Sequence, residues 1–69
     1  MRRERVVSKT IASIGHDQAG TLEVEFVSGT VYRYGGVEEE VYEDFMRASS
    51  KGQFFNEHIK DAYPFVRVK

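Results

Sequence analysis

The stretch with the clearest potential for chemistry is Ser50-Lys51-Gly52, which stands at the start of a predicted helix. The first amides of a helix have no partners within the helix, and such an end attracts phosphate or carboxylate groups. Gly52 removes side-chain bulk beside these amides, and Lys51 adds a positive charge. A second interpretation competes for the same amides, because Ser50 and Gln53 fit a capping box. The stretch therefore predicts an anion site, a tight cap, or both.

Two tyrosines on one predicted strand form the next candidate, because aromatic rings on a sheet can stack on nucleic-acid bases. In the alternative interpretation, Tyr32 and Tyr34 cover the core beneath the helices. Arg33 lies between them and either pairs with Glu23 across the strands or extends a basic face. The other members of such a face would be Lys51, Lys60 and Arg67. Asn56, on the second predicted helix, would hydrogen-bond the preceding turn or a ligand.

The sequence contains no pattern typical of catalysis or metal binding. His16 and His58 are the only histidines, neither has the spacing of a metal ligand, and cysteine is absent. No nucleophile motif, phosphate-binding loop or pair of acids in an apolar setting occurs. We therefore expect no enzymatic activity, no cofactor and no bound metal.

Composition indicates one small folded domain. The chain has 69 residues, of which 41% are hydrophobic and 30% charged, and these values are ordinary for a globular protein. The absence of cysteine removes any need for an oxidising compartment, and no apolar run approaches the ~20 residues of a membrane span. We therefore expect a cytoplasmic protein that does not enter the membrane.

The charge balance limits the kind of ligand. The formal net charge is −1, which argues against strong non-specific binding to nucleic acid, since that binding depends on releasing counterions from phosphates. A local basic patch is still compatible with this balance, because the acids concentrate in residues 38–44.

The elements that must position these residues are strands in the first half and helices in the second, which predicts an α+β fold. The expected elements are a three-stranded antiparallel meander over 9–16, 21–27 and 30–34, helices over 38–48 and from 51 to just before Tyr63, and a short C-terminal strand over 65–68. We expect residues 1–8 to be a flexible N-terminal arm and residues 9–69 to form a single domain.

The turn at Ser28-Gly29 determines which face the tyrosines occupy. A two-residue loop would pair Phe26 with Val31 and would place Arg33 on the apolar face. A three-residue loop with Gly29 in the left-handed conformation pairs Phe26 with Thr30 instead. We predict the second register, because it sets apolar residues opposite aromatic ones and Glu23 opposite Arg33.

The chain resembles the KTSC family along almost its whole length. The residues that carry the resemblance are Ser13-Ile14-Gly15 with Asp17, then Leu22, Val24, Phe26, Gly29 and Tyr32-Arg33-Tyr34, and finally Ser50-Lys51-Gly52, Phe55-Asn56, Ile59 and Tyr63-Pro64. Departures are His16, where an aromatic residue is commoner, and Val37-Glu38, where Val-Pro often opens the first helix. The family is named for the C-terminus of some lysyl-tRNA synthetases and also occurs as a stand-alone form, and the resemblance implies an RNA-binding role.

These observations predict a small non-catalytic module that binds RNA, another nucleic acid or a nucleotide. Phosphate would be held at Ser50-Lys51-Gly52 with help from Arg33 and Asn56, and Tyr32 or Tyr34 would offer a stacking surface. The alternative is a protein-interaction or self-association domain of a bacterial or phage protein, acting through an exposed sheet edge.

Overall fold

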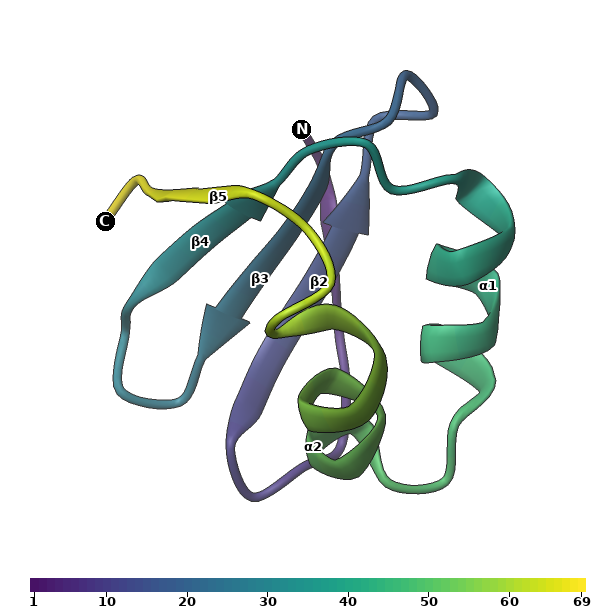
Figure 1. The fold of residues 1–69 in the computed structure, drawn as a ribbon. Coiled ribbons are helices and arrows are strands. Elements are labelled where there is room, and N and C mark those ends of the chain that lie inside the picture. The colour runs from purple at the N-terminus through teal and green to yellow at the C-terminus, as the bar shows by residue number, and fades with distance from the viewer.

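A single antiparallel sheet with both helical segments on one face makes up the domain (Figure 1). The computed structural model describes all residues from 1 to 69. The sheet has five strands in the order β1-β2-β3-β4-β5. The elements are β1 (Arg3–Arg5), β2 (Ile11–His16), β3 (Leu22–Phe26), β4 (Val31–Tyr34), α1 (Glu39–Arg47), α2 (Lys51–Phe54), the π-helical turn η1 (Phe55–Ile59) and β5 (Phe65–Arg67). The predicted α+β class is confirmed.

The hairpin between β3 and β4 has the predicted register. Val24 pairs with Tyr32 and Glu23 with Arg33, and the Phe26 amide donates to the Thr30 carbonyl at 2.9 Å. Gly29 has a φ of 98°, a left-handed conformation that costs glycine little because it has no Cβ. The three-residue loop therefore places both tyrosines on the face that the helices cover.

The two helical segments start and end close to their predicted limits. Ser50 is the N-cap of α2, and its hydroxyl accepts from the Gln53 amide at 3.2 Å. After Phe54 the helix widens into η1, where the Lys60 amide donates to the Phe55 carbonyl at 2.9 Å. The wider turn keeps residues four apart on one face, so Phe55 and Ile59 both enter the core.

The core lies between the sheet and the helices. Its members come from β2, β3, β4, α1 and η1 and from the loop before α1: Ile11, Ile14, Leu22, Val24, Tyr34, Val37, Phe45, Phe55 and Ile59. Phe45 is the only fully buried residue of α1. No helix in the structure is long and apolar enough to cross a membrane.

The N-terminal segment adds a strand that the sequence did not predict. Residues Arg3–Arg5 lie beside β2, with Arg3 opposite Gly15 and Arg5 opposite Ser13. In place of an arm outside the domain, this segment forms an edge of the sheet. The reason is a long-range contact, since the Arg3 guanidinium donates to the Glu23 carboxylate and to the Ser13 hydroxyl.

The C-terminal strand forms the opposite edge, as predicted. β5 pairs with β4, with Phe65 opposite Tyr34 and Arg67 opposite Tyr32. Beyond β5, the Val68 amide donates to the Val31 carbonyl at 2.8 Å, so the pairing continues toward the C-terminus. In Figure 1, β5 lies at the outer side of β4 with no strand beyond it.

Candidate functional site

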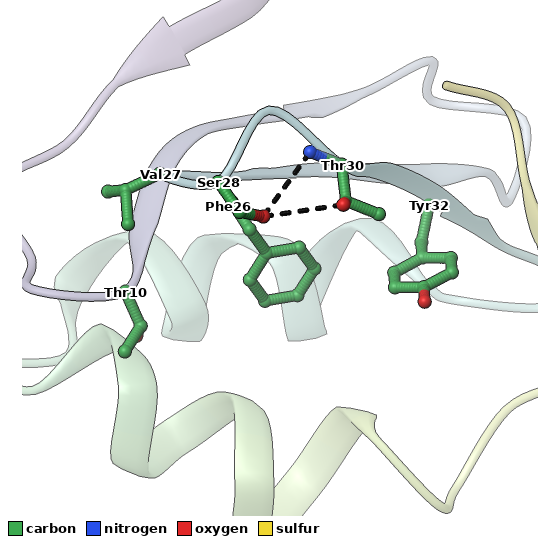
Figure 2. A pocket seen from close by; sticks show the side chains of 6 residues that line it. All are labelled: Thr10, Phe26, Val27, Ser28, Thr30 and Tyr32. Atoms are coloured by element: carbon green, nitrogen blue, oxygen red, sulfur yellow. Dashed lines mark hydrogen bonds between the residues drawn. The ribbon is translucent and has the colours of Figure 1, made fainter.

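Two hollows that share Thr10 as a lining residue lie between the β3–β4 hairpin and the start of α2. The first hollow, of about 380 Å³, is lined by Thr10, Phe26, Val27, Ser28, Thr30 and Tyr32 (Figure 2). The second, of about 450 Å³, is lined by Val7, Ser8, Lys9, Thr10, Ser49, Ser50, Lys51 and Gly52. Thr10 belongs to both, so we call the combined surface the Thr10 groove. These volumes lie in the range of small-ligand sites, which is about 300–1,000 Å³.

One wall of the Thr10 groove is aromatic. Figure 2 shows the rings of Phe26 and Tyr32 side by side, projecting from the hairpin toward the helical side. Their centroids are 5.8 Å apart in an edge-to-face arrangement, and Phe26 also meets Phe55 at 5.2 Å. Both Phe26 and Tyr32 are only partly buried. This wall therefore combines rings that the core holds in place with a ring edge that is open to a ligand.

The other wall is the start of α2, which is closely packed against Thr10. A Cβ built on Gly52 would lie 3.0 Å from the Thr10 hydroxyl oxygen, so a larger residue there would press on that wall. The Lys51 ammonium donates to the Ala48 carbonyl, just beyond the end of α1. Lys51 thus ties the two helices together, and the Ser50 hydroxyl occupies the Gln53 amide. The Ser50 cap is confirmed, but the capping box is incomplete, because the Gln53 side chain donates to Glu57 at 3.2 Å and does not return to the Ser50 amide. The anion role of these amides stays a prediction.

The electrostatics of the groove favour an anion. None of the residues lining the two hollows is acidic, and two of them, Lys9 and Lys51, are cationic. Lys9 is exposed and makes no hydrogen bond or ion pair in the structure. Hydroxyl groups at Ser8, Thr10, Ser28, Thr30, Ser49 and Ser50 add neutral donors and acceptors. A phosphate or sugar would therefore find partners here without carboxylate repulsion.

The structure brings some of the predicted site residues together and separates others. Tyr32 and the Ser50–Gly52 stretch both line the Thr10 groove. Tyr34 is only 3% exposed, so its ring belongs to the core, and burial together with the neighbouring Tyr32 raises its pKa to about 12. Asn56 is exposed on η1 but lines neither hollow.

Arg33 lies on the opposite face of the sheet, because successive residues of a strand point to opposite sides. Its Nε donates to the Glu23 carboxylate at 2.6 Å, which realises the predicted cross-strand pair. Near the ends of β4 and β5 it lines a different hollow, with Tyr34, Pro64 and Phe65 among its neighbours. Arg33 and the Thr10 groove are therefore separate features.

Glu23 is the centre of a charge network on the face that the helices leave open. The residue is only 3% exposed, because Arg3 and Arg33 both contact its carboxylate. Burial disfavours the charged form, but the hydrogen bonds and charges of Arg33 and Arg3 outweigh it and lower the pKa of Glu23. The Ser13 hydroxyl extends the network by donating to Glu25 at 2.7 Å.

Sequence reasoning missed Lys9, Thr10 and the burial of Glu23. Lys9 and Thr10 stand about 40 positions before the Ser50 stretch, and only the fold brings the two segments together. No local pattern marks such a pairing. For Glu23, the signal was the alternation of β3, which placed it on an uncovered face and therefore indicated exposure. No group of three acidic, histidine or cysteine side chains is arranged to hold a metal ion.

Comparison with known proteins shows relatives over the whole chain. A protein of Stutzerimonas stutzeri described only as uncharacterised is 41% identical over 70 residues, with 99% of each chain covered. The crystal structure of a KTSC domain protein from Yersinia pestis matches with a TM-score of 0.94 at 38% identity, and covers 99% of this chain and 97% of that one. The similarity to that structure extends to the sequence, so it reflects more than a shared fold.

A second kind of relative is much longer. The lysine–tRNA ligase of Nostoc punctiforme is 51% identical over 48 residues, which is 70% of this chain but only 9% of the ligase. Residues 7–63 match the family model described as the KTSC domain, and this span includes the Thr10 groove. The chain therefore belongs to the KTSC domain family.

Proposed function

We propose that this KTSC domain is a small non-catalytic binding module of the cytoplasm that holds single-stranded RNA or a nucleotide in the Thr10 groove. The observation that carries the proposal is the joining of an aromatic wall, a hydroxyl-rich wall and two lysines in one groove without an acid. Single-stranded nucleic acid is bound in other folds by the same combination, in which aromatic rings stack on bases and cations follow the backbone.

The two walls of the groove would contact different parts of the ligand, one the base and the other the phosphate backbone. A base would stack on the exposed part of the Tyr32 ring, which Phe26 and Phe65 already hold and which therefore loses little freedom on binding. A phosphate would lie near Thr10 and Lys9. Because the Lys51 ammonium is already bound to a carbonyl, Lys9 is the cation that can reach the ligand directly.

The family relationship favours RNA among the candidate ligands. Three relatives that share about 48 residues with this chain are lysine–tRNA ligases, enzymes whose name includes a transfer RNA. The shared stretch is 9% of each ligase, so the activity of the whole enzyme is not carried over. What supports the proposal is the presence of a KTSC-like segment in proteins that handle RNA.

Fluorescence polarisation with a labelled single-stranded RNA tests the proposal. We expect salt-sensitive binding, and Lys9→Glu should weaken it and reduce the slope of log affinity against log salt by about 1, since one phosphate contact is lost. Lys60→Glu is the matched control, because Lys60 is exposed and lines neither hollow. Tyr32→Leu keeps apolar bulk but removes the stacking face, which should cost about 1–3 kcal/mol of binding. The absence of salt-sensitive binding to RNA, DNA and nucleotides would refute the proposal.

A further inference from the structure

The free edge of the sheet at β5 is a second surface, separate from the Thr10 groove. β5 pairs only with β4 and has no strand on its other side (Figure 1). Two main-chain hydrogen bonds point inward, toward β4. The Pro64 carbonyl accepts from the Gly35 amide, and the Val68 amide donates to the Val31 carbonyl. Because hydrogen-bonding direction alternates along an antiparallel strand, the amides and carbonyls of Phe65 and Arg67 point outward. The edge therefore offers up to four unpaired main-chain groups to a further strand.

This edge is apolar as well as unpaired. Phe65 is 55% exposed, Val66 60% and Val68 42%. The Phe65 ring rests on Tyr32 and Tyr34, with centroid distances of 5.3 and 5.6 Å, which fixes its orientation while one side stays open. Exposed edges are usually protected by charges or bulges. Here Pro64 limits the strand at its start and Arg67 adds one charge, but the apolar side chains of Phe65, Val66 and Val68 stay exposed.

The charge around the edge selects the partner. β4 and β5 carry Arg33 and Arg67 and no acid, and Lys69 follows. Arg33 uses its Nε for Glu23, which leaves its two Nη groups free to contact an anion. Beside Arg33 and Phe65 lies a hollow of about 360 Å³, which has room for a side chain of a bound segment. An acidic ligand therefore fits this edge.

A second copy of the chain fits it poorly. The opposite edge is β1, with the sequence Arg-Glu-Arg, so pairing β5 with β1 of another copy would bring arginines together. Pairing β5 with β5 would gather two copies of Arg67, each with Lys69 close behind it, on one short pair of strands. Like charges opposite each other destabilise a pair of strands. The one strongly acidic stretch of this chain, Glu38–Glu40, begins α1 and is not free to extend.

We propose that β5 is a docking edge for an extended, acidic segment of another protein, which adds to the sheet as a further strand. The segment would carry an apolar residue opposite Phe65 and an acidic residue two positions along, opposite Arg67, because alternate residues share a face. Main-chain hydrogen bonds to Phe65 and Arg67 set its direction, and the charges of Arg33 and Arg67 set its composition. The proposal does not depend on nucleic-acid binding in the Thr10 groove.

Amide hydrogen exchange of the whole domain tests the docking edge, with two short peptides as probes. One repeats Val-Thr-Glu-Thr, so that valine and glutamate stand two positions apart on one face of the added strand, and the other repeats Val-Thr-Lys-Thr. The acidic peptide should slow exchange of the outward amides of Phe65 and Arg67 at least about tenfold, and the basic peptide should leave them unchanged. Arg67→Pro removes one outward amide without touching the pairing with β4, so it should abolish the protection. Arg67→Ala keeps the amide and should weaken binding only about two- to fivefold.

Reversing the charge of an edge residue provides a second test of the docking edge. Arg67→Glu should shift the preference toward the basic peptide, whereas Arg5→Glu on the other edge should leave the preference for the acidic peptide unchanged. Three results would overturn the proposal: no protection of β5 by the acidic peptide, equal protection by both peptides, or protection of β5 that appears without peptide as protein concentration rises. The last would assign the edge to a second copy of the chain.

Discussion

Removing the charge of Glu23 should destabilise the domain more than any other single change on the open face of the sheet. Glu23→Gln keeps the shape of the side chain but removes the negative charge that Arg3 and Arg33 both contact. The amide can accept only through its oxygen, and its NH₂ group faces a guanidinium. The variant therefore loses one of the two charge-assisted contacts and weakens the other.

The magnitude follows from the exposure of the three groups. A hydrogen bond to a charged group contributes about 1.5–3 kcal/mol when both partners are buried. The glutamate side chain is 4% exposed, but the arginines are 30% and 49% exposed and can be hydrated once released. We therefore expect a loss of about 2 kcal/mol, below the sum of two fully buried contacts. That is a large part of the stability of a domain this small.

The pH dependence of stability gives an independent check. The pKa of Glu23 in the folded state lies below its ordinary value of 4.5. A carboxyl group with a lowered folded-state pKa stabilises the protein above its unfolded-state pKa, and this contribution is lost as pH falls through the folded-state value. The wild type should therefore lose stability as the pH drops below about 5, and Glu23→Gln should lose less over the same interval.

Urea unfolding followed by circular dichroism, repeated from neutral to acidic pH, measures both effects. Glu25→Gln is the matched control, because Glu25 lies on the same face and strand but is only partly buried. It should cost less than about 1 kcal/mol. If Glu23→Gln is as stable as the wild type at neutral pH, or shows the same acid dependence, the network does not stabilise the fold and this reasoning is wrong.

Three further predictions follow from particular contacts. Gly15→Ala should displace β1 and destabilise the domain by about 1–3 kcal/mol in urea unfolding, because the added Cβ would lie 2.5 Å from the carbonyl oxygen of the residue before β1. Gly35→Ala is the control in the same assay, because a Cβ at that position meets nothing within 4 Å. The pKa of Tyr34 is raised to about 12, so its contribution to stability should be present below about pH 10 and lost as the pH rises further. Tyr34→Phe should flatten this alkaline loss of stability in urea unfolding, and an unchanged profile would show that Tyr34 is not its source. Ser50→Ala should cost about 1 kcal/mol through the lost cap of α2, whereas Ser49→Ala should be close to neutral in thermal unfolding.

Much of the fold could be predicted because its determinants are local. The alternation of Leu22, Val24 and Phe26 defines β3, and Gly29 with the pairing of Glu23 and Arg33 fixes the register of the hairpin. The cap at Ser50 likewise depends on neighbours in the sequence. These elements are specified within a few residues, so a single sequence is enough to identify them.

The parts of the fold that could not be predicted depend on contacts between segments that are distant in the sequence. β1 has no alternating apolar pattern, and its place in the sheet rests on pairing with β2 and on contacts of Arg3 with Ser13 and Glu23, which are 10 and 20 positions away. For the same reason, only part of the candidate site could be predicted from the sequence. Tyr32 and the Ser50 stretch were identified by residue type, but Thr10, which joins their two hollows, carries no sequence signal of its own.

The most direct test of the central claim is a proton–nitrogen NMR titration of the labelled domain with a short single-stranded RNA. Binding in the Thr10 groove predicts amide shifts concentrated at Lys9, Thr10, Tyr32 and Gly52, all of which Lys9→Glu should reduce. If no amide moves at millimolar RNA, or if the shifts fall only on the open face around Arg3 and Arg33, the Thr10 groove is not a nucleic-acid site.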